Sequence, residues 1–369
     1  MQAASATAPA TLPAPLTGVR HIVVLRPCAV GDFVFALPAL AALRATYPQA
    51  HITLLGRAWQ AELLAGRPGP VDEVRVLPTV PGVGAPADAV EDTAAVTALL
   101  DALNARGVDL AIQLYGGGGY ANPFLLRIAA RHRIGLRAPD APALDRTLPY
   151  VYLQNERLRL LETVGLAGAH ATTLDARLAV LPDDLAQAAR CVPMDDAKPL
   201  VVIQPGATDP RRCWAPARFA AVADALAEAG ARIAVNGSEA ERDRVRAVIT
   251  AMRADALDLA TPQLSLSGLL GLLSRATLLV SNDTGPLHLA QAVGTASVGI
   301  YWFTNLLISA PLAAARHRHA VSLQVHCPVC GRENVTAHCG HPASFVDAVG
   351  VDEVRTLALA LYREELARG

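Results

Sequence analysis

The sequence predicts an α/β protein made of two doubly wound domains that face each other across a cleft. Its 369 residues suit two domains of about 150 to 200 residues each. From residue 21 onward, short β-branched or apolar runs alternate with longer alanine- and leucine-rich stretches, which is the pattern of parallel sheets covered by helices. A second series of the same kind starts near residue 200.

The composition excludes several classes of protein. Apolar residues make up 52% of the chain and charged residues 18%, so most of its length should form packed cores. A formal net charge of −1 lacks the basic excess of a duplex-DNA binder, and we expect no nucleic-acid partner. No apolar run reaches the roughly 18 residues that suggest a membrane span. Six cysteines are few for a disulfide framework, which favours a reducing cytoplasm.

The first series of elements assigns residues 20–175 to an N-terminal domain. Before it, residues 1–19 are rich in Ala, Thr and Pro and predict a disordered arm, because they lack the basic start and apolar stretch of a signal peptide. Apolar and β-branched runs predict strands over 21–26, 51–55, 73–77 and 109–114. The stretches between them predict helices over 33–47 and 59–65 and a third helix that ends near residue 105.

The second series assigns residues 199–369 to a C-terminal domain. We expect strands over 200–204, 231–236, 277–281 and 296–301, and helices over 216–229, 239–253 and 286–293. A last helix over 351–367 could dock on either domain. Between the two series, residues 176–198 form a polar stretch with prolines, which predicts a linker.

Ligands of open parallel sheets bind at the carboxyl ends of strands, where loops lead into helices. One such loop runs from Arg26 to Gly31 and Asp32. Gly31 permits a tight approach of another group. Asp32 stands where a helix N-cap is expected, or it is a general base on the wall of the cleft.

Two loops of the second series carry more polar residues than a turn requires. In the first, Thr208, Arg211 and Arg212 follow a glycine turn, and they form either a phosphate cradle or a plain surface loop. The second has the sequence Ser-Asn-Asp-Thr-Gly-Pro-Leu-His over residues 281–288. Its proline suits the first helical position, with a Thr or Gly cap, and a helix N-terminus with these polar residues predicts an anion site.

The chain resembles glycosyltransferase family 9, the heptosyltransferases of lipopolysaccharide assembly, in four stretches. They read RPCAVGDFVFALPAL, QPGATDPRRCW, NGSEAER and SNDTGPLHLAQAVG. The resemblance implies a GT-B fold of two Rossmann-like domains, with the acceptor on the N-terminal one and the nucleotide-sugar on the C-terminal one. It also implies metal-independent, inverting transfer, by analogy from ADP-heptose to a saccharide or lipid-linked saccharide of the cell envelope.

The resemblance also implies roles for individual residues. Asp32 corresponds to the family's base, and Arg26 and Gly31 lie on the acceptor side. Glu239 or Glu241 contacts the nucleoside, with a slight preference for Glu239. The donor diphosphate is held by Thr208, Arg212, Asp283, Thr284, Gly285 and His288. The family usually has Lys where this chain has Arg212, and a planar guanidinium does not replace an ammonium neutrally at a tight site.

Cysteine and histidine residues gather near the C-terminus. Cys327, Cys330 and Cys339, with histidines nearby, have spacing that suits tetrahedral zinc, or iron. The alternative, which we prefer at this point, is a set of reduced cysteines that close a loop.

Two other functions stay open beside transfer. One is a GT-B nucleotide-sugar epimerase, which the loop with Asp32 argues against. The other is a nucleotide-sugar-binding pseudoenzyme or assembly partner, supported by Arg212. We expect a cytoplasmic protein, with peripheral contact to the inner membrane only where the acceptor is lipid-linked.

Overall fold

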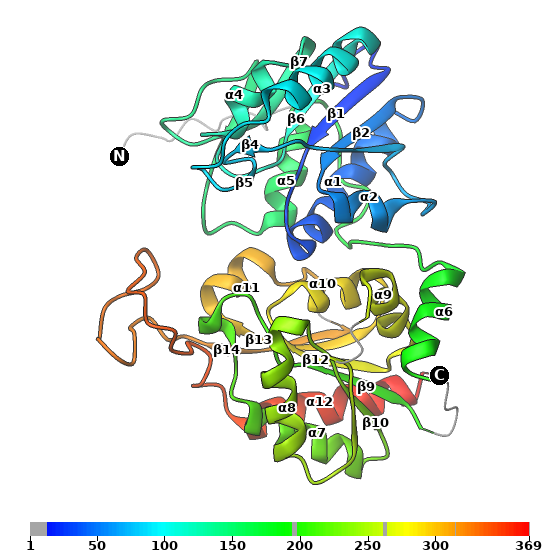
Figure 1. Cartoon of the computed structure of the whole chain (residues 1–369), viewed down its shortest axis with the longest axis vertical. Coiled ribbons are helices and arrows are strands. Elements are labelled where there is room, and N and C mark those ends of the chain that lie inside the picture. The colour runs from blue at the N-terminus through cyan, green and yellow to red at the C-terminus, as the bar shows by residue number, and fades with distance from the viewer. Residues whose placement is uncertain (1–12, 194–197, 261–263, 314, 369) are drawn as a thin grey trace, which may run out of the picture.

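Two six-stranded parallel sheets form the two lobes of the molecule (Figure 1). The computed structural model describes residues 13–193, 198–260, 264–313 and 315–368. The predicted α/β class with two doubly wound halves is confirmed. Residues 1–12 of the predicted arm lie outside the described residues. Its last part lies against the N-terminal lobe, because the amide of Leu16 donates a hydrogen bond to the hydroxyl of Tyr47 (3.0 Å).

The N-terminal sheet has the strand order β3-β2-β1-β6-β7-β8. Its central strand β1 is buried along its whole length, as its apolar run predicts. The strands are β1 (His21–Leu25), β2 (His51–Gly56), β3 (Glu73–Val76), β6 (Val108–Gln113), β7 (Ala130–Arg137) and β8 (Arg146–Pro149), with a separate short pair β4 (Val80–Pro81) and β5 (Gly84–Ala85). The helices are α1 (Val30–Thr46), α2 (Ala58–Leu64), α3 (Thr93–Arg106), α4 (Ala121–Leu126) and α5 (Glu156–Gly165).

The C-terminal sheet repeats this order as β11-β10-β9-β12-β13-β14. Its strands are β9 (Leu200–Gln204), β10 (Arg232–Val235), β11 (Ala256–Asp258), β12 (Leu278–Asn282), β13 (Ala296–Trp302) and β14 (His317–Ser322). The helices are α6 (Pro182–Cys191), α7 (Pro216–Glu228), α8 (Arg242–Ala251), α9 (Leu266–Arg275), α10 (Gly285–Ala292), α11 (Phe303–Ser309) and α12 (Val351–Leu366), with 3-10 turns η1 (Pro210–Arg212) and η2 (Glu239–Glu241).

When the strands of each sheet are numbered by their order along the chain, both sheets have the Rossmann-like order 3-2-1-4-5-6. In such a sheet the order reverses beside the first strand, and ligands bind at that point, outside the carboxyl ends of the strands. The reversal lies between β1 and β6 in one lobe and between β9 and β12 in the other. The loops that leave β1, β9 and β12 are the three polar loops found in the sequence.

Helices α1 and α10 pack against each other where the lobes meet (Figure 1). One hydrophobic cluster runs through both lobes and includes Phe33 and Leu40 from α1 with Leu287 and Leu289 from α10. The last helix α12 packs on α7 and on the C-terminal sheet, which settles its docking partner. Among the described residues, we find no helix that combines the length and apolar character needed to cross a membrane.

The segment 176–198, for which the sequence predicts a linker, holds helix α6, which packs on α9. The N-terminal lobe reaches this helix through Arg67, whose guanidinium makes two hydrogen bonds to the carboxylate of Asp184 (2.7 and 3.0 Å). Both side chains are almost fully buried. The described residues 176–193 of this segment are thus a packed part of the junction between the lobes.

Candidate active site

A cleft of about 520 Å³ lies between the two lobes at the carboxyl ends of β1, β9 and β12. It is bounded on one side by the start of α1 and on the other by the loops of the C-terminal lobe. Its polar lining residues include Asp32, Gln204, Thr208, Arg212, Asn236, Ser238, Glu241, Asp283, Thr284, His288, Asn305 and Ser309. Most residues predicted from the three loops therefore meet in one place.

Asp32 lies in the first turn of α1 and is exposed to the cleft. The helix begins at Val30 with Ala29 as its N-cap, so the expectation that Asp32 caps the helix is wrong. An acidic side chain in the first turn interacts favourably with the positive end of the helix dipole. This position leaves the carboxylate free of capping geometry and directed at the cleft.

Arg26 lies beneath the loop and not in the cleft, with only 3% of its surface exposed. Its guanidinium donates to the carbonyl of Asp32 (2.7 Å) and to that of Leu114, and it forms an ion pair with Glu156 (3.0 Å). Burial alone would lower the pKa of Arg26, but the neighbouring negative charges raise it above the ordinary value. Arg26 therefore holds the backbone that carries Asp32 and is placed too deep to touch an acceptor in this structure.

The starts of α1 and α10 approach closely, and glycine makes this approach feasible. A Cβ atom on Gly31 would lie 2.9 Å from Cδ2 of His288, and one on Gly285 would lie 3.3 Å from Cβ of Val30. The ring of His288 also meets the edge of Phe35, with centroids 4.6 Å apart. The N-terminal ends of two helices, both positive, thus border the same cleft.

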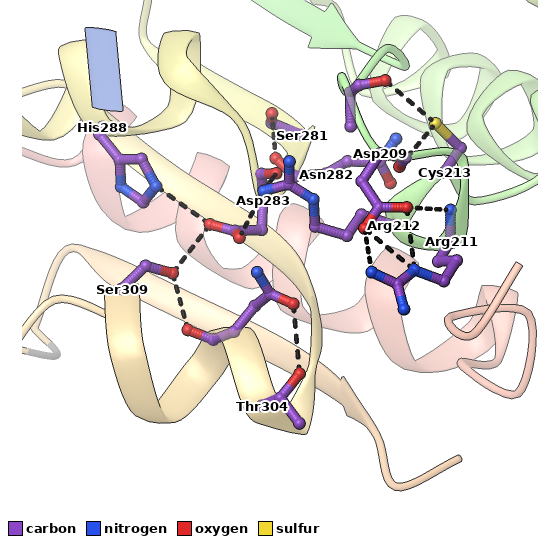
Figure 2. A network of polar contacts seen from close by, with 12 residues as sticks. Asp209, Arg211, Arg212, Cys213, Ser281, Asn282, Asp283, His288, Thr304 and Ser309 are labelled. Atoms are coloured by element: carbon purple, nitrogen blue, oxygen red, sulfur yellow. Dashed lines mark hydrogen bonds and ion pairs between the residues drawn. The ribbon is translucent and has the colours of Figure 1, made fainter. Parts of the chain in front are cut away.

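Asp283 is the centre of a buried hydrogen-bond network (Figure 2). Its Oδ1 accepts from Nε2 of His288 (3.0 Å) and from the hydroxyl of Ser309 (2.9 Å), and its Oδ2 pairs with Arg212 (3.2 Å). Burial would raise the pKa of Asp283, but the hydrogen bond and charge of His288, followed by the charge of Arg212, lower it below its ordinary value. Because this carboxylate is charged and already satisfied, it positions its neighbours better than it could bind an anion itself.

Thr284 is the N-cap of α10 and lines the cleft with Gly285, and Pro286 occupies the first turn. The first amides of a helix lack partners inside it and point outward at the positive end of the dipole. Asn282 joins this loop to the one after β9, because its side chain donates to the carbonyl of Pro205 (2.7 Å) and accepts from the amide of Trp214 (3.1 Å). The two loops therefore form one wall of the cleft.

The two arginines of the loop after β9 point in different directions (Figure 2). Arg212 reaches Asp283 and lines the cleft. Arg211 turns away, pairs with Asp209 (2.8 Å) and lies over the ring of Trp302, 5.3 Å from its centroid. Of this pair, Arg212 is the cation that faces the cleft.

The acidic candidates after β10 are separated by the structure. Glu241 lines the cleft, where its carboxylate accepts from the amide (2.8 Å) and the hydroxyl (3.0 Å) of Ser238. Glu239 has a side chain 63% exposed and pairs with Arg242 outside the cleft lining. The slight preference for Glu239 therefore disagrees with the geometry. The capping-box spacing, with Glu three residues after Ser238, is the sequence signal that distinguishes Glu241 from Glu239.

Two residues of the network had no signal in the sequence. Ser309 ends α11, a helix that the sequence did not predict. Arg157 crosses from α5 of the N-terminal lobe, donates to the carbonyls of Ser309 (2.9 Å) and Ala310 (3.0 Å), and lies over the ring of Phe35 at 4.7 Å. Burial lowers the pKa of Arg157 to about 10. These contacts connect the N-terminal lobe to the neighbours of Asp283.

A second group of side chains gathers in the loop between β14 and α12. Cys327, Cys330, Cys339 and His341 bring their ligand atoms within 4.8 Å of one another. Cys327 is buried, and its Sγ lies 3.7 Å from Nδ1 of His341. The three predicted cysteines are thus close together, and the fourth group is a histidine.

The sequence profile of glycosyltransferase family 9 (heptosyltransferase) matches residues 96–338, more than half of the chain. No curated protein matches the chain in sequence. Three similar solved structures share the fold. A family 9 glycosyltransferase from Veillonella parvula DSM 2008 has a TM-score of 0.75 and 18% identity, covering 94% of this chain and 97% of that one.

The other two structures come from E. coli. The ADP-heptose lipopolysaccharide heptosyltransferase II has a TM-score of 0.71 and 18% identity, over 94% of this chain and 99% of that one. The iron-containing dodecameric glycosyltransferase TibC of the enterotoxigenic strain H10407 has a TM-score of 0.54 and 13% identity, over 95% and 78%. The two Rossmann-like lobes thus form the GT-B fold, and the chain belongs to glycosyltransferase family 9 and is a glycosyltransferase.

Proposed function

We propose that this enzyme transfers a sugar from a nucleoside-diphosphate donor, ADP-heptose by family, to a saccharide of the cell envelope, with inversion and without a catalytic metal. The observation that carries the proposal is the opposition of Asp32 on one lobe to the helix end and cation on the other. One side of the cleft supplies a base and the other supplies stabilisation for an anion. A lipid-linked acceptor would bring the enzyme to the cytoplasmic face of the inner membrane, where we propose that it acts.

The diphosphate site would consist of the first turn of α10 and the loop after β9. Thr284 and Gly285 supply the helix end, Thr208 a hydroxyl and Arg212 a positive charge. Asp283 fixes Arg212 and His288 from behind. Groups oriented in advance stabilise the charge that develops on the leaving diphosphate without reorganising during the reaction.

The nucleoside would lie next to Glu241. Its carboxylate is fixed by Ser238, and the neighbouring Asn236 is fixed by Gln204, whose Oε1 accepts from it (2.6 Å). A fixed carboxylate accepts hydrogen bonds from two adjacent hydroxyls, as a ribose presents them. Glu241 is therefore our candidate for the ribose contact in place of Glu239.

The reaction would take place in one displacement step. Asp32 accepts the proton of the acceptor hydroxyl while that oxygen bonds to the anomeric carbon of the donor sugar. The bond from that carbon to the diphosphate oxygen breaks, and its electron pair leaves with the nucleoside diphosphate beside Arg212 and α10. Because the oxygen enters opposite the leaving group, the anomeric configuration inverts.

We also propose a structural metal ion, zinc or iron, at Cys327, Cys330, Cys339 and His341. Three sulfurs and one imidazole nitrogen within 4.8 Å form a donor set that suits a closed tetrahedral site. Such an ion supplies a crosslink in the loop, and no step of the transfer passes through it.

The test is a transfer assay with ADP-heptose and envelope saccharides, in which ADP release and the anomeric configuration of the product are measured. Asp32→Asn should bind ADP like the wild type and lose about 10²–10⁴-fold in kcat, the usual contribution of a general base. Asp101→Asn, at an exposed position of α3, is the matched control. Turnover retained by Asp32→Asn would remove Asp32 as the base, and ADP binding without any transfer by the wild type would favour a nucleotide-sugar-binding pseudoenzyme.

A further inference from the structure

The metal-ligand loop lies against the loop that would bind the donor diphosphate. A cavity of about 360 Å³ separates them, lined by Thr208 to Arg212 on one side and by His338, Gly340, His341 and Pro342 on the other. His341 is therefore both a member of the Cys/His cluster and a wall of this cavity. Figure 1 shows the loop between β14 and α12 projecting from the side of the C-terminal lobe.

The loop has little regular structure of its own to hold its shape. Among the described residues between β14 and α12, the one β-bridge is isolated and joins His326 to Glu333. Loops of this length without helices or strands are uncommon in compact domains, and most of them are functional or disordered. A metal crosslink between Cys327 near its start and His341 near its end would hold this loop in one shape.

The first two cysteines already form a turn suited to a metal. In the sequence Cys-Pro-Val-Cys-Gly, the amide of Gly331 donates to the carbonyl of Cys327 (2.9 Å), and Gly331 has a φ of 71°. That backbone conformation is easy for glycine and costly for other residues. Cys327 is anchored in the hydrophobic cluster that also contains Trp302 and Phe345, while Cys330 is exposed.

Arg211 links this loop to the donor site. The amide of Phe345 donates to the carbonyl of Arg211 (2.8 Å). The ring of Phe345 packs on Trp302, with centroids 4.8 Å apart, and the guanidinium of Arg211 lies over the same indole. Trp302 in turn donates through Nε1 to the carbonyl of Gln324 (2.7 Å), at the start of the loop. Both ends of the loop thus hold the indole on which Arg211 rests, one residue from Arg212.

We propose that the metal ion at Cys327, Cys330, Cys339 and His341 is zinc, because three thiolates and one imidazole form a structural zinc set, and that this ion positions the donor-phosphate loop through Trp302, Phe345 and Arg211. Zinc occupancy then sets the affinity for the nucleoside diphosphate, although the zinc ion lies away from the transferred sugar. The inference rests on the proposed function of Arg212 and Thr208. Arg211, Trp302 and Phe345 are positioning residues in this arrangement.

The experiment measures metal content by mass spectrometry and ADP affinity by calorimetry on the same preparations of the full chain. Wild type should carry one zinc per chain, and Cys330→Ser should lose it and bind ADP about tenfold more weakly. Cys191→Ser, in α6 and outside the cluster, should keep both properties. Circular dichroism and the thermal unfolding midpoint show whether each variant is folded.

A second route avoids dependence on one variant. Removing the metal from wild type with a chelator should weaken ADP binding, and adding zinc back should restore it. Cobalt in place of zinc should give the absorption of thiolate-to-cobalt charge transfer. In Arg211→Ala, which breaks the link, ADP affinity should be reduced and should no longer respond to the metal, as a coupled pair requires.

The outcomes separate the two proposals. Loss of zinc with an unchanged Kd for ADP would overturn the coupling, and wild type that neither carries nor takes up zinc would overturn the metal site. Iron in place of zinc would overturn the identity of the ion. Wild type that holds zinc but does not bind ADP would instead overturn the proposed donor site.

Discussion

Gly31→Ala tests how closely the two lobes must approach at the cleft. The new Cβ would lie 2.9 Å from Cδ2 of His288, a separation that real Cβ contacts essentially never show. His288 cannot turn aside freely, because Asp283 holds its Nε2 at 3.0 Å and Phe35 packs against its ring. Either the ring or the helix α1 must move by several tenths of an ångström.

Two opposing effects decide the sign of the stability change. Alanine favours a helix over glycine by about 0.5–1 kcal/mol, whereas overpacking a tight contact costs about 1–3 kcal/mol. The sum is a loss of between about 0 and 2.5 kcal/mol, and the upper end corresponds to roughly 5–10 °C in the unfolding midpoint of a large domain. Displacing His288 misaligns the hydrogen bond to Asp283, so ADP affinity should fall about tenfold, which corresponds to about 1.4 kcal/mol.

The matched control is Gly165→Ala at the end of α5, where nothing lies within 4 Å of the added methyl group. This control should be neutral or stabilised by up to about 1 kcal/mol and should bind ADP normally. Thermal unfolding and calorimetry compare the two variants. If Gly31→Ala were stabilised like the control and kept its Kd for ADP, the close contact between α1 and His288 would have no role in the donor site.

The remaining predictions concern the opposite wall of the cleft. Arg212→Ala should weaken ADP binding, measured by calorimetry, about 10- to 100-fold, since a hydrogen bond to a charged group contributes about 1.5–3 kcal/mol. Arg212→Lys should recover much of that loss. Equal ADP affinities of wild type and both variants would show that the phosphate lies elsewhere. Because the pKa of Asp283 is lowered in the folded protein, its contribution to stability is present above its ordinary pKa and is lost as the pH falls through the folded value. The free energy of unfolding, measured from pH 6 downward, should therefore fall less steeply below about pH 4 in Asp283→Asn than in wild type. The control Asp88→Asn, at an exposed position, should follow wild type. Identical slopes for all three proteins would contradict a lowered pKa of Asp283.

The central strands of both sheets could be predicted because burial on both faces leaves a continuous apolar signal. Strand β9 has the predicted bounds, and β1, β2 and β12 differ from prediction by a single residue at one or both ends. The outer strand β7 has the sequence Ala-Arg-His-Arg-Ile-Gly-Leu-Arg with exposed charges, so the same signal is absent. Edge strands β8 and β14 were missed for the same reason.

Local helix signals explain two differences between prediction and structure. The stretch with Pro182 and two aspartates suggested a linker, but a proline followed by acidic residues is also how many helices begin, and the structure has α6 there. The helix carrying Asp32 begins at Val30 without a side-chain cap among the described residues. A start without a capping residue leaves no mark in the sequence, and this is why capping by Asp32 stays open in the sequence beside its role as a base.

The candidate site could be predicted where its residues share a short loop. Asp283, Thr284 and His288 lie together because a strand end and the helix after it bring them together. Contacts between the lobes, such as Arg157 with the carbonyl of Ser309, join residues far apart in the chain. No periodicity or spacing encodes such a pair.

The central claim is that the cleft between α1 and α10 binds the nucleoside diphosphate of the donor. Calorimetric titration of wild type and Arg212→Ala with ADP, GDP and UDP, without added metal, tests it most directly. We expect wild type to bind ADP with a Kd on the order of 1–100 µM, GDP and UDP to bind more weakly, and Arg212→Ala to lose most of this affinity. Absence of nucleotide binding by wild type, or ADP binding that is the same in Arg212→Ala, would contradict this claim.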